Sequence, residues 1–272
     1  MNVAIQGFAA SFHEIAAKRI FGEDIQLKYC RTFKEAFQEL EEGKVDRAVV
    51  AIENSLYGSI NDVYDLLLQH RFWICGEIYE HIGLHLMGPQ GSNLQNVTDV
   101  YSMAPALGEA EAYLDENLPK AERHEHADTA LAAKEVADWG DPTKAAVASR
   151  SAADAYGLTI LASNIETHHE NYTRFIALSR VEVASSNVTK TSITFQTADT
   201  PGSLHAALGV FASRSINLSK LESRPIVGNA WQYMYYVDFD ASFSEAIQTE
   251  LSKHATNIRV LGSYTNGALE SI

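Results

Sequence analysis

The chain has 272 residues, of which 46% are apolar, and its formal net charge at pH 7 is −14. A chain of this length and composition can bury a sizeable core, and we expect a globular protein of about two domains. The negative charge argues against nucleic acid as a partner, and the lack of a run of about eighteen apolar residues argues against a membrane span.

The N-terminus and the cysteines both indicate a cytoplasmic protein. Residues 1–5 lack the basic flank and the long apolar stretch of a signal peptide. The two cysteines, Cys30 and Cys75, cannot form a disulfide framework, and we expect both to behave as small buried hydrophobic residues.

The acidic charge lies mainly ahead of residue 190, because residues 190–272 hold 6 basic and 7 acidic side chains. An anionic ligand would therefore have to be held by local amides, hydroxyls and a few arginines.

The start of the chain predicts alternating strands and helices. Apolar strands are expected at residues 3–5, 25–29 and 48–52. The helices between them begin after Ser11 and Thr32, each with a glutamate three positions later, which is a capping-box pattern. The uninterrupted run 48–52 is typical of a strand buried on both faces of a parallel sheet. Ligands of open α/β sheets lie beyond the carboxyl ends of strands, so loops 7–11 and 53–55 are candidate site loops.

A further helix and a second α/β unit follow. The expected elements are a helix at 61–70, strands at 73–78, 81–87, 97–102 and 145–148, and helices at 105–117 and 129–139. Ser149 directly follows the last of these strands, again at a carboxyl end. Two such lobes with facing loops would enclose a cleft, which is the usual place for a small ligand.

A polar stretch without periodicity at 181–190 is interpreted as a linker between a larger region, 1–180, and a smaller one, 191–272. The smaller region is expected to contain a strand at 192–198, a helix at 201–213, strands at 218–225 and 231–239, a helix at 243–254 and a strand at 258–264. Ser242 and Glu245 form the capping pattern of the second helix. This order of elements is a βαββαβ sandwich.

Two short motifs carry candidate chemistry. Glu53, Asn54 and Ser55 place a carboxylate, an amide and a hydroxyl directly after a buried strand. Thr173 and Arg174 place a hydroxyl beside a guanidinium at a strand entrance. Taken alone, the first motif also suits a helix-capping loop, and the second suits an ordinary strand entrance with one exposed arginine. The residues by themselves leave these interpretations open.

The histidine-rich loop 168–170 does not predict a metal site. His168 and His169 are adjacent and should point apart, and no further ligand can be identified beside Glu170. We expect no metal.

With their spacing and neighbours, the two motifs resemble the prephenate dehydratase family along nearly the whole chain. The stretch 51–59 is similar to one family signature, in which proline often stands at the position of Ala51, and 171–175 is similar to a second, centred on its threonine. Residues 128–130 and 145–149 resemble two further family blocks. The tail resembles an ACT domain, the ligand-sensing module attached to these enzymes.

The resemblance implies an α/β fold with a bilobal catalytic region, similar to type II periplasmic binding proteins, followed by the ACT domain. It implies that prephenate loses carbon dioxide and its ring hydroxyl to give phenylpyruvate, in L-phenylalanine biosynthesis, without a cofactor. We expect Thr173 to donate to the leaving oxygen while Glu53 and Asn54 set its orientation or proton supply. The substrate-binding residues implied by the matched motifs are Ser11, Ser55, Ser102, Ser149, Arg174 and Phe175. Whether Arg174 pairs with a substrate carboxylate or holds the loop stays open.

The ACT resemblance implies regulation by L-phenylalanine bound between paired domains, and hence a homodimer or homotetramer. The implied effector residues are Pro201, Gly202, Ser203, Leu204, Asn217, Leu218, Glu222, Ser223, Arg224 and Pro225. Ser203 stands where family members carry alanine. No chorismate mutase segment is expected ahead of Val3.

The chain departs from the family pattern after Ser102. Members commonly continue with His, Pro, Gln and Ala and have a glutamine seven residues after the serine, whereas this chain has residues 103–106 reading Met, Ala, Pro and Ala, and Glu109 at the later position. Ala10 also stands where glycine is usual. Two alternatives stay open. Arogenate dehydratase would share the chemistry on a substrate with an alanyl instead of a pyruvyl group, and a non-catalytic amino-acid sensor would keep both folds without turnover.

Overall fold

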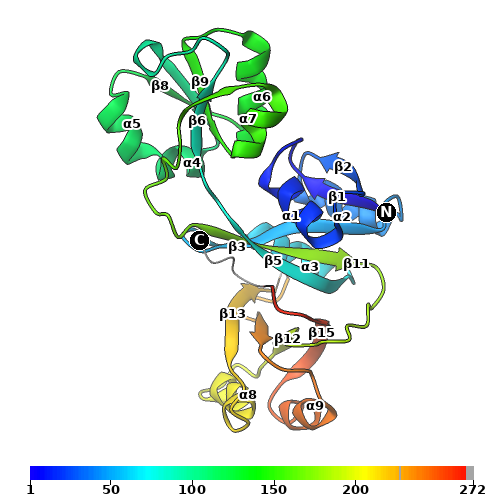
Figure 1. The fold of residues 1–272 in the computed structure, drawn as a ribbon. Coiled ribbons are helices and arrows are strands. Elements are labelled where there is room, and N and C mark those ends of the chain that lie inside the picture. Colours follow the sequence, from blue (N-terminus) through cyan, green and yellow to red (C-terminus); the bar gives the residue numbers. More distant parts are fainter. Residues whose placement is uncertain (227, 268–272) are drawn as a thin grey trace.

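The computed structural model describes residues 1–226 and 228–267 and contains three sheets (Figure 1). The first sheet has the strand order β2-β1-β3-β11-β5, with the short β4 paired to β3. Its strands are β1 (Asn2–Gln6), β2 (Gln26–Cys30), β3 (Arg47–Asn54), β4 (Gly58–Ser59), β5 (Trp73–His81) and β11 (Tyr172–Ser179). Its helices are α1 (Phe12–Phe21), α2 (Phe33–Glu41) and α3 (Asn61–Gln69). The predicted caps are present, because Ser11 accepts from the amide of Glu14 and Thr32 from that of Glu35.

The second sheet forms the other lobe, with the order β10-β6-β9-β7-β8. Its strands are β6 (His85–Gly88), β7 (Asp99–Ser102), β8 (Glu122–Glu125), β9 (Lys144–Ala148) and β10 (Thr159–Ala162). Its helices are α4 (Ala104–Glu109), α5 (Glu111–Asn117), α6 (Thr129–Trp139), α7 (Arg150–Tyr156) and the short 3₁₀ turn Leu94–Asn96. The chain enters this lobe after β5 and returns before β11, so two connections join the lobes (Figure 1).

Two predictions for this lobe were wrong in detail. The helix expected at 105–117 divides at Ala110, because the carbonyl oxygen of Glu109 accepts from both the amide and the hydroxyl of Thr167, at 2.7 and 2.8 Å. The strand expected at 81–87 is interrupted, since β5 runs on to His81 and β6 begins at His85. Strand β8, with the charged sequence Glu-Arg-His-Glu, was not predicted, and it lies at a sheet edge where charged side chains are common.

The third sheet is antiparallel, with the order β13-β14-β12-β15. Its elements are β12 (Lys190–Gln196), α8 (Ser203–Ala212), β13 (Leu218–Pro225), β14 (Tyr233–Phe239), α9 (Glu245–Leu251) and β15 (Thr256–Tyr264), which is the expected βαββαβ order. The N-cap of α9 is Ser244, which accepts from the amide of Ile247, and not the expected Ser242. Both helices lie on the side of the sheet away from the first lobe (Figure 1). In the part of the chain that is described, no helix has the length and apolar character needed to cross a bilayer.

The third sheet shares a hydrophobic core with the first lobe. Tyr236, Leu261 and Tyr264 pack in one cluster with residues of α2, α3 and β5. Tyr236 also donates its hydroxyl to the carbonyl of Tyr64 at 2.5 Å, and Arg259 donates to three carbonyls at the end of α3 and beyond it. The C-terminal sheet therefore packs directly against the first lobe of the same chain and shares its core.

A close backbone approach at Gly262 predicts a stability effect. A Cβ added to Gly262 of β15 would overlap the carbonyl oxygen of Ile74 in β5, a contact that only backbone movement can relieve. We expect Gly262→Ala to lower the free energy of unfolding by about 1–3 kcal/mol, measured by urea titration. Gly209→Ala is the control, since nothing lies near that Cβ in α8 and alanine favours a helix. Equal stability of the Gly262 variant and the parent would contradict the packing.

Candidate functional site

A cavity of about 850 Å³ lies between the two lobes. Its wall from the first lobe includes Asn54 of β3, Thr173 and Phe175 of β11, and the start of α1. Its wall from the second lobe includes Glu109 of α4 and the loop before α6. The cavity therefore sits at the carboxyl ends of strands and the starts of helices, where the alternation of strands and helices predicted a ligand site.

The side chains of Asn54, Thr173 and Asn171 form one hydrogen-bonded group in this cavity. The Oδ1 of Asn54 accepts from the backbone amides of Leu56 and Tyr57, at 2.9 and 3.0 Å. This fixes which end of the amide carries hydrogens, because only an oxygen can accept two N–H donors. The Nδ2 of Asn54 then donates to the Oδ1 of Asn171 at 2.7 Å and to the Oγ1 of Thr173 at 3.0 Å.

This arrangement leaves the hydroxyl proton of Thr173 available for a further acceptor. Its oxygen already accepts from Asn54, and among the described residues no group accepts its proton. The residue is 9% exposed, and it lines the cavity. Thr173 thus presents an O–H donor to whatever occupies the cavity.

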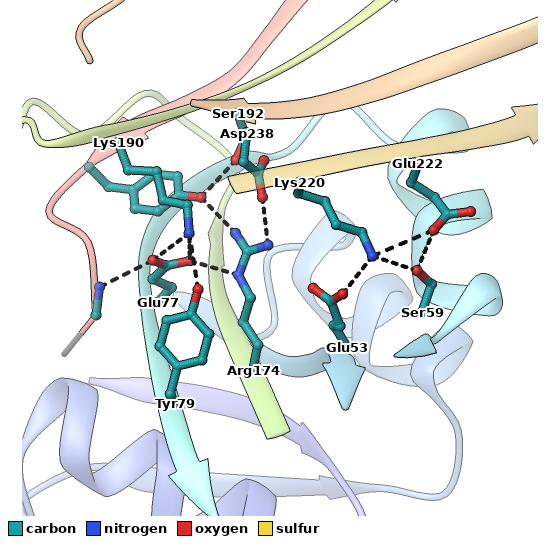
Figure 2. Close-up of polar contacts among 12 residues, drawn as sticks. Glu53, Ser59, Glu77, Tyr79, Arg174, Lys190, Ser192, Lys220, Glu222 and Asp238 are labelled. Atoms are coloured by element: carbon teal, nitrogen blue, oxygen red, sulfur yellow. Dashed lines mark hydrogen bonds and ion pairs between the residues drawn. The ribbon is translucent and has the colours of Figure 1, made fainter. Parts of the chain in front are cut away.

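Glu53 and Arg174, each next to one of these residues, face the other side of the sheet (Figure 2). Successive side chains of a strand point to opposite faces, and Glu53 and Arg174 are direct partners in the register of β3 and β11. Neither residue lines the cavity. The Nζ of Lys220, in β13, lies 2.6 Å from the carboxylate of Glu53 and 2.7 Å from the hydroxyl of Ser59, which also donates to Glu222.

Arg174 is 4% exposed and binds three elements at once (Figure 2). Its guanidinium donates to Glu77 of β5 at 2.7 Å, to Asp238 of β14 at 2.5 Å and to the hydroxyl of Tyr264 of β15 at 3.0 Å. Lys190 donates to the other oxygen of Glu77 at 3.0 Å, so two cations meet two carboxylates. Burial alone would lower the pKa of Arg174, but Asp238, Tyr264 and Glu77 raise it above its usual value. Of the two roles that the sequence left open, this geometry favours a structural one.

The remaining predicted substrate residues occupy several environments. Phe175 and Ser11 line the cavity. The hydroxyl of Ser149 caps α7 and donates to the carbonyl of Ala10, and that of Ser102 is fully buried and donates to the carbonyl of Val147 at 2.6 Å. Neither of these serines lines the cavity. Ser55 joins the two motif loops, since it donates to the carbonyl of Glu170 and accepts from the amide of Tyr172.

Among the titratable residues that line the cavity but were not predicted site residues are His13, Glu109 and Asp128. Asp128 caps α6 by accepting from the amides of Ala130 and Leu131, and burial raises its pKa against the effect of these bonds. Glu109 accepts from the hydroxyl of Tyr57 at 3.4 Å. The usable signal for His13 was its place in the first turn of a helix that follows a strand, two residues after the cap.

The loop 168–170 brings no shared ligand set together. The Nδ1 of His168 lies 3.2 Å from Glu109, and that of His169 lies 3.3 Å from Glu166. The group with metal-ligand spacing in the described residues is Asp99, Glu122 and His124 at the edge of the second lobe, and no predicted site residue belongs to it.

A second cavity, of about 530 Å³, lies in the C-terminal unit at the start of α8. Of the predicted effector residues, Gly202, Ser203 and Leu204 line it. The other predicted effector residues do not line it. Asn217 donates to Asp240, while Glu222 and Arg224 face the first lobe, where Arg224 forms a bidentate pair with Asp65 of α3 at 2.9 and 2.8 Å. Of the predicted effector segments 201–204 and 222–225, the structure brings residues of the first alone to this cavity.

Comparisons with curated proteins give consistent relatives. The family model described as prephenate dehydratase matches residues 3–183. A bifunctional chorismate mutase/prephenate dehydratase of Aquifex aeolicus is 36% identical over 99% of this chain and 75% of its own length. Arogenate dehydratase/prephenate dehydratase 2 of Arabidopsis thaliana is 39% identical over 97% of this chain and 72% of its own length.

Solved structures agree with these relatives over nearly the whole chain. A prephenate dehydratase from Arthrobacter aurescens in complex with L-Phe has a TM-score of 0.88 and 27% identity, covering 97% of this chain and 90% of that one. A structure described as GqqA, a novel type of quorum quenching acylase, has the same TM-score and identity and covers 98% of both chains. The family model spans well over half of the chain, and both curated relatives exceed 30% identity over most of their length. The chain therefore belongs to the prephenate dehydratase family.

Proposed function

We propose that the chain catalyses the decarboxylating dehydration of prephenate to phenylpyruvate in L-phenylalanine biosynthesis. The observation that carries this proposal is the hydroxyl of Thr173, which accepts from Asn54, lines the cavity and has no acceptor for its own proton among the described residues. Aromatisation of the ring supplies the driving force, so the site has to orient a dianion and stabilise the departing hydroxide. Thr173 donates to that oxygen, and Asn54 sets the direction of the donation. Glu53 has no part in this step, because its carboxylate faces Lys220.

The test is to add prephenate and to measure the formation of phenylpyruvate by its ultraviolet absorbance. Wild-type protein should turn prephenate over. L-Arogenate would give L-phenylalanine instead of phenylpyruvate, so chromatographic measurement of phenylalanine formed from L-arogenate should show whether the amino substrate is preferred. A folded protein that converts neither compound would support the non-catalytic sensor and would refute the proposal.

Arogenate is the second candidate substrate, for a specific reason. It carries an ammonium group where prephenate carries a ketone, and the buried carboxylate of Glu109 lines the cavity. An ammonium ion beside a carboxylate forms a charge-assisted hydrogen bond that a ketone cannot form. A higher kcat/KM for arogenate that falls in Glu109→Gln would establish this preference.

We propose that the C-terminal unit is an ACT domain that binds L-phenylalanine. The two lobes that precede it are proposed to have the plan of type II periplasmic binding proteins. The βαββαβ order and the cavity beside residues 202–204 support this assignment, and the related structure from Arthrobacter aurescens contains L-Phe. Because the predicted effector segment 222–225 does not line this cavity within one chain, we propose that a neighbouring chain completes the pocket in a homodimer or homotetramer. Light scattering with and without phenylalanine tests the assembly, and a monomer under both conditions would contradict it.

Regulation is proposed to pass through Lys220. This residue of β13 binds Glu53, and Glu53 adjoins Asn54, which orients Thr173. We expect Lys220→Met to reduce the effect of phenylalanine on kcat/KM to less than about 2-fold, because the substitution removes the ionic contact between β13 and β3. Lys253→Met is the control, since Lys253 is exposed and, among the described residues, forms its ion pair with Glu250 of α9, away from the first lobe. An unchanged phenylalanine response in Lys220→Met would exclude this route.

A further inference from the structure

His13 is a buried imidazole on the wall of the cavity. It lies in the first turn of α1, is 9% exposed and lines the same space as Thr173. Its ring meets the edge of Phe175 with centroids 4.9 Å apart and an interplanar angle of 86°, and it contacts Phe33 at 5.7 Å. Two aromatic neighbours therefore fix the orientation of the ring.

The hydrogen bonds of His13 decide its tautomer. Its Nε2 accepts from the backbone amide of Ala51 at 3.2 Å, in a stretch of β3 where the pairing with β11 shifts register. A backbone N–H can only donate, so Nε2 carries no proton, and a neutral imidazole then carries its proton on Nδ1. Burial lowers the pKa of His13 to about 3, so the ring stays neutral at physiological pH.

The Nδ1–H of His13 is an available donor. Within residues 1–226 and 228–267, no group bonds this nitrogen. The Nδ1 atom of His13 is also not sealed from solvent. Because a donor left unsatisfied in a buried site is costly, this N–H is suited to a ligand acceptor in the cavity.

We propose that His13 binds the side-chain carboxylate of the substrate through Nδ1–H, an inference that rests on the proposed function. Prephenate has two carboxylates, and only the ring carboxylate leaves as carbon dioxide. A strong donor on the departing carboxylate would stabilise the ground state and slow its loss, whereas a donor on the side-chain carboxylate holds substrate and transition state equally. Arg31 and Lys34 line the same cavity, as do the acidic residues Asp62, Asp65, Glu109 and Asp128, so the proposal rests on the local donor at Nδ1 and not on the net charge of the wall. The same group is present in arogenate, so the contact does not depend on which substrate is preferred.

The test is His13→Gln, because the carbonyl oxygen of glutamine can take the place of Nε2 and accept from Ala51, while the donor at Nδ1 is lost. We expect KM to rise about 10- to 100-fold with kcat within about 3-fold of the parent. Hydrogen bonds to charged groups are strong, and this bond is equally strong in the bound substrate and in the transition state. The Kd of phenylpyruvate, which retains the side-chain carboxylate, should rise by the same factor in a calorimetric titration. His13→Asn, whose amide nitrogen can take the place of Nδ1, should recover part of the loss.

His85→Asn is the matched control. His85 is also buried, and its Nδ1 accepts from the amide of Asn164 at 3.2 Å, but it does not line the cavity, so its variant should keep the parent KM and Kd. An unchanged Kd in His13→Gln, or a loss confined to kcat, overturns the inference, as does a wild-type protein that fails to bind phenylpyruvate. If His13→Gln does not fold, the Kd of phenylpyruvate is compared between His13→Asn, which keeps a donor, and His13→Phe, which has none. Weaker binding by His13→Asn than by His13→Phe would overturn the inference. Absence of turnover with normal phenylpyruvate binding would refute the proposed function alone.

Discussion

Replacement of Thr173 by valine is expected to lower kcat about 100- to 10,000-fold, because it removes the positioned proton donor that faces the leaving oxygen. Valine keeps the shape of threonine, and the Nδ2 of Asn54 retains its bond to Asn171, so the fold should be preserved. Initial rates of phenylpyruvate formation from prephenate measure the loss, and urea unfolding checks that the variant is folded. Full turnover by a folded Thr173→Val protein would remove Thr173 from the mechanism.

Two further variants separate the hydroxyl from its orientation. Thr173→Ser retains the donor and should keep kcat within about 10-fold of the parent. Asn54→Asp has nearly the same shape, and one carboxylate oxygen can still accept from the amides of Leu56 and Tyr57. The other oxygen would accept the proton of Thr173 and turn it away from the substrate. Asn54→Asp should therefore resemble Thr173→Val, although Thr173 itself is intact.

The sequence predicted the place of the site better than the role of each residue in it. Capping patterns and buried strands located the loops that form the cavity wall, and Asn54 and Thr173 lie there as expected. Glu53 was expected to assist Thr173 although it is adjacent to Asn54 in a strand, and the two-residue period of a strand places such neighbours on opposite faces. That error could have been avoided from the sequence alone.

Other features depended on contacts that no local pattern contains. The partners of Arg174 come from β5, β14 and β15, up to 97 residues away in the chain. Ser102 ends β7 and Ser149 follows β9 at the expected edge, but both hydroxyls donate to backbone carbonyl groups. A strand end predicts that a side chain lies near a site, and only the tertiary packing decides whether that side chain is free to bind.

Arg174→Met is expected to lower the free energy of unfolding by about 3–5 kcal/mol, because it leaves buried carboxylates without their cation. Asp238 loses the cation nearest to it, at 2.5 Å, while Glu77 keeps Lys190. The loss should be measured by urea unfolding of the whole chain. Arg123→Met is the control, since its bridges to Asp115 and Glu111 are largely exposed and such pairs contribute at most about 1 kcal/mol.

A second substitution distinguishes an unpaired charge from lost packing. Asp238→Asn removes the negative charge while keeping a polar side chain, so Arg174→Met combined with Asp238→Asn should be destabilised less than the sum of the two single changes. Because Arg174 adjoins Thr173 in β11, the same network also ties the strand that carries the donor to β14 and β15. If Arg174→Met instead kept full stability and lost substrate binding, the guanidinium would act on substrate, and the paired carboxylates would not be the reason for its presence.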